Sequence, residues 1–495
     1  PYTGRSIVNE PGIALFQIIN EKTMLKSGEI RMLSEPHRKK LDARWRSFLK
    51  ARKLPESSFP LELNDSAQGR RFAFEIYRAH LTEMHSFLRT LGVRVPICGS
   101  SKPFGAGDAV ASSGMDFQSS HSYYDDPRGT ISPSAKNPTN WWNRSPLAEP
   151  LWGSAGMMSN LGQVALKGSP MVLGEWNYCY PNFYRAEGIP LLVSLASYQS
   201  VDALVFFGAS ATGFLGKWDR FLKNPAIYIH SQQTDPATWG QSQMAALLFR
   251  RGDVRPAERK LVARVPEKVL VENGVNLMER IPFLPALGEY RITTGECNWL
   301  GELVLKSASG EKVYHKILNR LKDRRSNSRR IVSDTGEIRR YSSPMILLID
   351  TPRVQVISGE VADLRKTGDS TTDLSVNTAM KHVTISMISL DGSVLRDSRR
   401  ILMTAVANAA NRSVQADFVK GEIYDLGKAP VVAEPLSMKI EFICSRRMKI
   451  YQLHSGTGER QMELPAEYQN GKLRFQLTPA NHSIYYELAD PIPQP

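Results

Sequence analysis

The fold is decided by residues 13–21, IALFQIINE, a largely apolar run that ends in an amide, Asn20, and a carboxylate, Glu21. A run of this kind is typical of a strand buried on both faces, as in the centre of a parallel sheet. In α/β barrels the chemistry lies at the carboxyl ends of such strands. The run therefore predicts a central parallel strand that delivers Glu21 to a functional rim.

A second stretch, residues 171–176 with the sequence MVLGEW, is also a short apolar run that ends in a carboxylate, Glu175. Two parallel strands that each deliver a glutamate to one rim would supply the pair of carboxylates that glycoside hydrolysis uses. The alternative interpretation is structural, because a glutamate at a strand end can also accept backbone hydrogen bonds or cap the next helix.

The fold class predicted for the whole chain is α/β followed by all-β. Residues 1–255 alternate strand and helix patterns, which favours parallel α/β architecture. The expected strands start near residues 13, 93, 115, 171 and 203, and the expected helices cover 41–49, 68–91, 154–166, 183–200 and 237–250.

Beyond residue 255 the pattern changes in two steps. Residues 256–345 are predicted to be an intermediate β-rich region, with strands at 262–265 and 268–271. Residues 346–495 hold short alternating strands, such as those at 354–359 and 383–387, and predict an accessory β-sandwich domain that packs on the first part. An independent sugar-binding module is the alternative, in which Tyr451, Tyr485 and Tyr486 stack on a sugar.

Composition and charge exclude several classes of protein. The 495 residues are 42% hydrophobic and 23% charged, as in an ordinary globular protein, and no apolar run approaches the ~18 residues of a membrane span. The net charge of +14 divides evenly, with +7 on residues 1–250, so we expect no nucleic-acid-binding domain. The four cysteines lie far apart, with no metal-ligand spacing, so we expect neither a zinc site nor a disulfide framework. We also expect no other metal and no cofactor.

Three motifs in order, Asn20-Glu21, His121-x-Tyr123 and Gly174-Glu175-Trp176, carry a family likeness. Residues 1–250 resemble the C-terminal part of a clan A retaining glycoside hydrolase, with cellulase-like (family 5) and β-galactosidase-like TIM barrels closest in character. The resemblance implies strands four to eight of a (β/α)8 barrel in residues 1–255. It also implies an oligo- or polysaccharide substrate and favours a secreted or periplasmic location.

The same resemblance implies a role for each site residue. Glu21 would be the acid/base and Glu175 the nucleophile of a retaining double displacement. Asn20 would bind the sugar 2-hydroxyl, and His121 and Tyr123 would line the sugar subsite, with Tyr123 hydrogen-bonded to Glu175. For His121 the alternative is a histidine satisfied at a strand end.

Aromatic residues supply the remaining expectations about substrate binding. Trp176 is predicted to contact substrate, and Trp141 and Trp142 offer further flat faces for stacking, although a tryptophan is as often simple packing. The family often has a tryptophan at the end of strand eight, where this chain has residues 206–208, FFG.

Strands one to three of the barrel would precede residue 13, so the resemblance predicts a barrel truncated at its N-terminus. We expect the chain as given to be catalytically inactive, with open sheet edges and an exposed apolar patch. The alternative from another class is a non-catalytic carbohydrate-binding or structural protein on a degenerate barrel.

Overall fold

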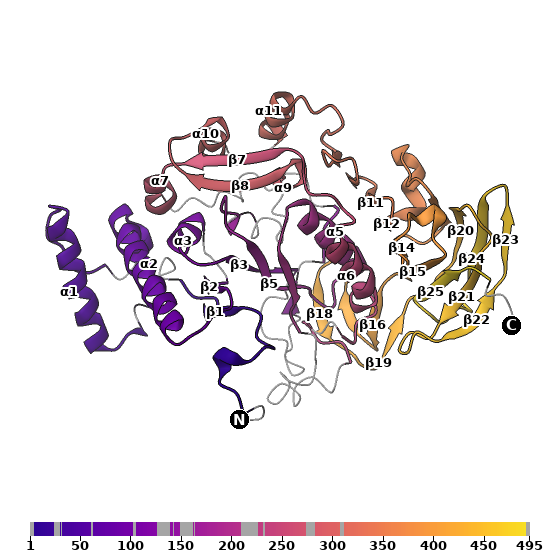
Figure 1. Ribbon diagram of the computed structural model, residues 1–495, viewed down its shortest axis with the longest axis horizontal. Coiled ribbons are helices and arrows are strands. Elements are labelled where there is room, and N and C mark those ends of the chain that lie inside the picture. Colours follow the sequence, from indigo (N-terminus) through magenta and orange to yellow (C-terminus); the bar gives the residue numbers. More distant parts are fainter. Residues whose placement is uncertain are drawn as a thin grey trace.

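The computed structural model describes residues 4–23, 30, 32–60, 63–101, 105–125, 139–141, 143–148, 162, 164–208, 226–230, 233–273, 283–306 and 311–491. They form an elongated molecule, with an N-terminal α/β part at one end and a β-sandwich at the other (Figure 1). No helix in these ranges is long and apolar enough to cross a membrane.

Five parallel strands form near the predicted positions. They are β1 (Phe16–Ile19), β2 (Ile97–Ser100), β3 (Gln118–Tyr124), β5 (Met171–Tyr178) and β6 (Ala203–Phe206). β1 pairs with β2, and β3, β5 and β6 form a second parallel sheet. The two sheets meet where the backbone N–H of Asp116 donates to the carbonyl of Ile97 at 3.0 Å. The parallel arrangement is confirmed, whereas a closed barrel is not present among the described strands.

Open sheet edges are present among the described strands. Within the described ranges β1 pairs only with β2, and β6 pairs only with β5. Leu15 beside β1 is 38% exposed and Val205 in β6 is 47% exposed, whereas Val172 of the central strand β5 is buried. Neighbouring strands therefore shield β5, which carries Glu175, better than they shield the outer strands.

The helices of this part cover the strands. They are α1 (Glu35–Ala51), α2 (Ala67–Thr90), α3 (Ala106–Ala111), α5 (Arg185–Tyr198) and α6 (Ser242–Arg251), with 3₁₀ turns η1 (Ile7–Asn9), η3 (Leu63–Asp65) and η4 (Trp239–Gln241). The side chain of Ser66 caps α2 by accepting from the N–H of Gly69 at 2.9 Å. Every residue of α5 is buried, because structure covers it on all sides. The predicted helix at 154–166 lies almost wholly outside the described residues.

The prediction of a β-rich region at 256–345 is wrong. Two parallel strands, β7 (Lys260–Val265) and β8 (Glu289–Thr294), are accompanied by helices α7 (Glu267–Glu272), α9 (Leu284–Leu287), α10 (Trp299–Lys306) and α11 (Glu311–Leu321). They form a layer along the upper edge of Figure 1. The expected strand at 268–271 is part of α7. That helix is held against α2 by Arg71, whose guanidinium lies 2.8 Å from Glu267 and 3.1 Å from Glu272.

The C-terminal part is a β-sandwich, as predicted, but its large sheet begins earlier than residue 346. In the described chain this antiparallel sheet has the order β22-β21-β25-β15-β14-β12-β11-β10-β9, so it starts at Arg330. Its strands are β9 (Arg330–Val332), β10 (Ile338–Ser342), β11 (Met345–Asp350), β12 (Val354–Gly359), β14 (Val383–Ser389), β15 (Arg400–Val406), β21 (Lys449–Leu453), β22 (Arg460–Leu464) and β25 (Tyr485–Ala489).

The second sheet has the order β13-β20-β24-β23 among the described residues. Its strands are β13 (Leu374–Thr378), β20 (Met438–Ile443), β24 (Lys472–Leu477) and β23 (Ala466–Gln469). The 3₁₀ turn η5 (Val361–Thr367) lies between β12 and β13, and η6 (Leu395–Asp397) lies between β14 and β15. A separate core of apolar side chains fills the space between the two sheets. Because successive side chains of a strand point to opposite faces, each sheet buries the side chains of one face inside the sandwich.

The central strands of the large sheet, β11, β12 and β14, are buried on both faces. In β11, Ile346 and Leu348 belong to the core between the two sheets, whereas Leu347 and Ile349 belong to the core shared with the N-terminal part. Successive side chains of a strand point to opposite faces, so one strand serves both cores. Helices α5 and α6 contact this second face. The predicted packing of the sandwich on the first part is therefore present.

A four-strand excursion leaves the sandwich between β15 and β20. It comprises β16 (Ala409–Arg412), β17 (Gln415–Asp417), β18 (Glu422–Asp425) and β19 (Lys428–Ala433). β18 pairs with β4 (Thr139–Asn140), which lies in the connection that follows β3. We call residues 407–434 the arm. In Figure 1 β16, β18 and β19 lie below α5 and α6, toward β5.

Candidate active site

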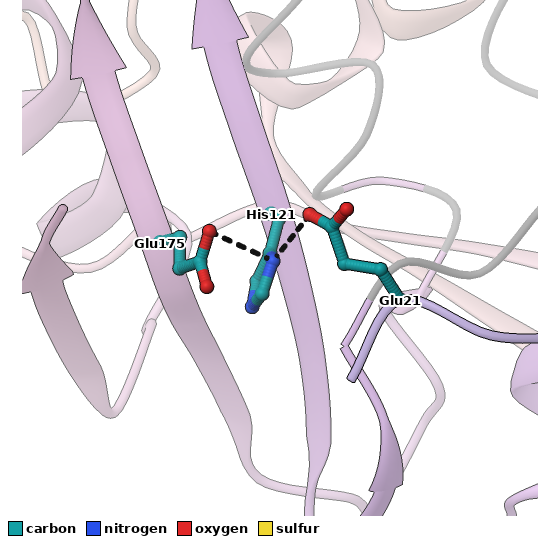
Figure 2. A group of neighbouring side chains, drawn as sticks. All are labelled: Glu21, His121 and Glu175. Carbon is teal, nitrogen blue, oxygen red and sulfur yellow. Dashed lines mark hydrogen bonds and ion pairs between the residues drawn. The ribbon is translucent and has the colours of Figure 1, made fainter. Parts of the chain in front are cut away.

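Glu21, His121 and Glu175 converge from three separate strand segments. His121 lies between the two carboxylates (Figure 2), with its Nδ1 atom 2.7 Å from Oε1 of Glu21 and 3.2 Å from Oε2 of Glu175. One donor atom from each residue can be chosen so that all three lie within 4.8 Å of one another. The histidine side chain is 2% exposed, and those of Glu21 and Glu175 are 30% and 22% exposed. The pair predicted from sequence is thus together, at an accessible edge.

A β-bulge aims Glu175 into this cluster. The pairing of β3 with β5 runs Ser120 to Leu173 and then His121 to Glu175, so Gly174 is an extra residue in β5. A Cβ at Gly174 would lie 2.7 Å from Oγ of Ser119 and 3.3 Å from Nε2 of His121. Bulges re-aim side chains in this way next to active sites, and here the absence of a Cβ lets the imidazole of His121 and the hydroxyl of Ser119 lie where they do.

The backbone at Glu21 is held in a less usual conformation. Its φ angle of +51° lies in the left-handed region, which residues other than glycine seldom adopt. Bonds to the next residue fix the turn, because the N–H of Lys22 donates to Oγ of Ser100 at 3.1 Å and its carbonyl accepts from Tyr77 at 3.1 Å. Strain of this kind is typical of sites where a side chain must be held in place.

Tyr123 lies beside Glu175 and donates a hydrogen bond from its phenol to Oε2 of that carboxylate. Burial raises the pKa of Tyr123, and the bond to Glu175 and the negative charges of Glu175 and Glu21 raise it further. The phenol therefore stays protonated and remains a donor to the carboxylate at any ordinary pH. The hydrogen bond expected from the sequence is present.

An aromatic wall surrounds Tyr123. Its ring centroid lies 5.6 Å from that of Phe207, in an edge-to-face arrangement, and 5.0 Å from that of His230. Phe207 directly follows β6. His230 was not singled out from the sequence, because it belongs to a segment brought here only by tertiary structure.

Asn20 is exposed next to Glu21. Its Oδ1 atom accepts from Nε2 of Gln17 at 2.9 Å and from Oγ of Ser101 at 3.3 Å. With the oxygen facing the protein, the amide NH2 is the group oriented to donate elsewhere. This orientation fits the donor role expected of Asn20 toward a sugar hydroxyl.

The tryptophans do not form the expected sugar platforms. Trp176 has an exposed fraction of 0%, with its ring centroid 3.8 Å from that of Phe206, and Trp141 is 3% exposed. A side chain with no accessible face cannot stack on a sugar, so both residues are packing residues in this structure. Trp142 lies outside the described residues.

Two of the three tyrosines expected of a sugar-binding module are buried. Tyr486 is 0% and Tyr485 8% exposed, whereas Tyr451 is half-buried with the guanidinium of Arg460 over its ring at 4.1 Å. The interpretation of the sandwich as an independent sugar-binding module therefore loses two of the three side chains that motivated it.

The cluster has two chemical capacities. Two carboxylates at this separation can act as acid/base and nucleophile on one bond. One imidazole nitrogen and two carboxylate oxygens are also a donor set that zinc or another transition metal accepts, although the sequence predicted no metal. Removal of metal separates these two possibilities, as described below.

Comparison with known proteins adds little. No profile of a known family matches the chain, and no curated protein is detectably similar to it in sequence. Among solved structures it is similar to a rhamnosidase from Novosphingobium sp. PP1Y, at 9% identity and a TM-score of 0.27 over 92% of this chain and 43% of that one. It is also similar to alpha-L-fucosidase isoenzyme 2 from Paenibacillus thiaminolyticus, at 9% identity and a TM-score of 0.27, over 90% of this chain and 75% of that one.

The chain spans 43% of the length of that rhamnosidase. Both neighbours are glycosidases by name, but a TM-score of 0.27 does not establish a shared fold.

Proposed function

We propose that this protein hydrolyses O-glycosidic bonds in an oligo- or polysaccharide by a retaining double displacement. The observation that carries the proposal is the placement of Glu21 and Glu175, with one oxygen of each and Nδ1 of His121 all within 4.8 Å. Retaining enzymes hold their carboxyl groups about 5–5.5 Å apart, whereas inverting enzymes need about 6.5–9.5 Å to admit a water. The two carboxyl groups thus approach each other to within 4.8 Å at one pair of oxygens, and this close approach is what supports the retaining course.

In the first step Glu21 gives its proton to the glycosidic oxygen. The bond from that oxygen to the anomeric carbon breaks as a carboxylate oxygen of Glu175 bonds to the carbon. In the second step Glu21 takes a proton from water, whose oxygen attacks the anomeric carbon and releases Glu175. Roles are assigned by Tyr123, whose hydrogen bond stabilises an ionised Glu175 and so favours it as the nucleophile.

His121 would organise both carboxylates. When both glutamates are ionised they can only accept, and the hydrogen of these contacts then lies on Nδ1 of His121; when Glu21 carries the proton for the first step, it can donate to Nδ1 instead. In either state the imidazole lies between the two groups and helps to hold their separation, which the chemistry requires to within about 0.5 Å.

The decisive experiment treats the full-length natural protein with activated 2-fluoro glycosides of several sugars. Hydrolysis of the matching nitrophenyl glycoside and a covalent label on Glu175, located by peptide mass spectrometry, are expected. Glu21→Ala should retain activity only on activated substrates and recover rate with azide. Label on neither glutamate, together with no hydrolysis across a broad panel of glycosides and polysaccharides, would refute the proposal. Product of inverted configuration would refute only the retaining course.

The alternative of a non-catalytic sugar-binding protein is less well supported. Such a protein needs exposed aromatic faces, and Trp141, Trp176, Tyr485 and Tyr486 are all buried. The second candidate is a metal-dependent centre, favoured by the donor set of Glu21, His121 and Glu175.

A further inference from the structure

The arm, residues 407–434, extends from the sandwich to the connections that follow β3, β5 and β6. Strand β3 carries His121 and Tyr123, β5 carries Glu175, and Phe207 directly follows β6. Its apolar side chains share a cluster with the α/β part, which includes Trp141, Tyr180, Ile227, Ile423 and Leu426. A segment of the sandwich therefore helps to build the surroundings of the site.

The arm first holds the connection after β3. Strand β18 pairs with β4, with Glu422 opposite Asn140. The N–H of Trp141 donates to the carbonyl of Gly421 at 2.9 Å. Gly421 has a φ of +69°, and a Cβ there would lie 2.2 Å from the carbonyl oxygen of Trp141. Glycine is required at this close approach of two backbones.

The second attachment is to the connection after β5. The hydroxyl of Tyr180 donates to the carbonyl of Leu426 at 3.1 Å and accepts from the N–H of Asn411 at 3.2 Å. Arg185 donates to the carbonyl of Ala409, and its guanidinium is paired with the buried Asp235 at 2.6 Å. The base of the arm is thus tied to the first turn of α5.

The third attachment is to residues 226–230, which come after β6. Oδ1 of Asn411 accepts from the N–H of Ile227 at 2.7 Å, and its Nδ2 donates to the carbonyl of Ile227 at 2.7 Å and to that of Leu426 at 2.8 Å. Asn411 is buried. A single amide therefore satisfies both backbone groups of Ile227, which fixes that residue as a strand partner would.

The other end of this segment lies against the catalytic groups. The carbonyl of His230 accepts from Nδ2 of Asn177 at 2.7 Å, and Asn177 is on β5 two residues after Glu175. The ring of His230 lies against that of Tyr123, the donor to Glu175. Only two residues lie between Ile227, which Asn411 holds, and His230 in the aromatic wall of the site.

We propose that Asn411 is a positioning residue for the catalytic centre, which holds residues 227–230 so that His230 keeps Tyr123 in hydrogen-bonding contact with Glu175. The inference rests on the proposed function. Asn411 touches neither substrate nor reacting atoms and acts through Tyr123. A loss of its two bonds to Ile227 loosens the start of the segment, while the bonds from Tyr180 to Ile229 and from Asn177 to His230 remain; the ring of His230 then moves away from Tyr123 and the bond to the nucleophile weakens.

The test is a double-mutant cycle in the full-length protein. Asn411→Ala alone should lower kcat about 10- to 100-fold, because a shift of about 1 Å far from the chemistry can have effects of this size, with KM nearly unchanged. In a Tyr123→Phe background, Asn411→Ala should lower kcat by less than about threefold, because the hydrogen bond from Tyr123 to Glu175 is already absent. Val419→Ala, at the 97% exposed tip of the arm, is the control and should leave kcat unchanged.

Hydrogen exchange separates positioning from folding. In Asn411→Ala, deuterium uptake should rise at residues 226–230 and at the N–H of Tyr180, which donates to the carbonyl of Ile229, while the rest of the protein keeps its protection. If Asn411→Ala unfolds, Asn411→Asp, which keeps the acceptor for Ile227 and loses both donors, takes its place in the cycle.

The outcomes are distinguishable. Multiplicative effects of the Asn411 and Tyr123 substitutions on kcat, or faster exchange at 226–230 with unchanged kcat, would overturn the positioning role and leave the glycosidase proposal standing. Wild-type protein with no glycosidase activity would overturn the proposed function and the positioning role together.

Discussion

Tyr123 and Glu175 lie on the adjacent strands β3 and β5 and are joined by a hydrogen bond from the phenol to Oε2 of the carboxylate. Glu175 pairs with His121, and Tyr123 is two residues further along the same strand, on the same face. The two side chains that touch Glu175 are therefore fixed by one strand, and the geometry of the nucleophile depends on the register between β3 and β5.

Removal of this hydroxyl tests its role directly. Tyr123→Phe is expected to lower kcat about 10- to 100-fold, because a hydrogen bond to a charged group is worth about 1.5–3 kcal/mol. Steady-state kinetics on the best glycoside measure the change. Tyr290→Phe is the matched control, since Tyr290 is fully buried and its hydroxyl has no hydrogen-bond partner among the described residues. Equal kinetics in both variants would contradict the assigned role.

A methyl group at the bulge should displace His121. In Gly174→Ala the new Cβ would lie 3.3 Å from Nε2 of His121 and 2.7 Å from Oγ of Ser119. We expect kcat to fall roughly 100-fold, since the imidazole that spaces the carboxylates must move. The melting temperature should change by only a few degrees. Gly114→Ala, which meets nothing within 4 Å, should leave both quantities unchanged.

Chelation separates hydrolysis by two carboxylates from metal-dependent chemistry. Dialysis against EDTA is expected to leave activity unchanged, because the proposed reaction uses only Glu21 and Glu175. Added zinc should inhibit in competition with substrate, since a metal bound by Glu21, His121 and Glu175 would occupy the reacting groups. Loss of activity in EDTA that is restored by one divalent metal would favour the metal-dependent centre instead.

A buried carboxyl at the interface predicts a dependence of stability on pH. Glu187 of α5 is bonded to Ser145 and to His382 of the sandwich, 3.1 Å away. Burial raises the pKa of Glu187, and the charge of Glu360 adds to this effect, which outweighs the lowering by His382 and Ser145. The folded state therefore holds this proton more tightly than the unfolded state does.

The sign follows from proton binding. Stability is greatest below the ordinary pKa of the unfolded carboxyl and is lost as pH rises through the raised folded pKa, by at most about 1.4 kcal/mol per pH unit. Glu187→Gln cannot ionise, so its melting temperature relative to wild type should increase across that window. Thermal melts from pH 4.5 upward measure the difference. In the control Glu83→Gln, at an exposed position, the melting temperature should follow that of the wild type at every pH. If the melting temperature of Glu187→Gln differed from that of the wild type by the same amount at every pH, titration of Glu187 would be ruled out.

Strands whose pattern is set by burial alone could be predicted from the sequence. The strand expected at 354–359 is β12 with the same bounds, and residues 171–176 lie within β5. Both are buried on both faces, so their apolar runs identify them whatever their neighbours are. Glu21 does follow the end of β1, but the prediction that the second strand ends at Glu175 is wrong, because β5 runs on to Tyr178 and the bulge at Gly174 aims Glu175 from inside the strand.

Features that depend on distant parts of the chain could not be predicted in this way. The run at 268–271 has the residue types of a strand, but it follows Pro266 and becomes a helix that buries Leu270 and Val271. Trp176 follows Glu175 immediately and looks like a site residue, but packing against Phe206 buries it. Burial of a strand side chain is decided by its tertiary partners.

The same limit applies to the environment of the site. Asn411 is 236 residues away from Glu175 in the sequence, and His230 follows a stretch with no strand pattern, so no local signal connects either residue with the nucleophile. The bulge at Gly174 could not be predicted from the sequence either, since a glycine before a glutamate is common. Local patterns therefore predicted the chemical groups, but not the residues that hold them.

The two-faced large sheet has a consequence for the evolution of this protein. Leu347, Ile349 and Val356 face the helices of the α/β part, whereas Ile346 and Ile357 face the second sheet. If the sandwich were moved to another protein, the sheet face that carries Leu347, Ile349 and Val356 would be exposed to water. If the sandwich were deleted, α5, which has no exposed residue, would lose part of its cover. Each part covers an apolar face of the other, so neither could be transferred alone to another protein without exposing that face to water.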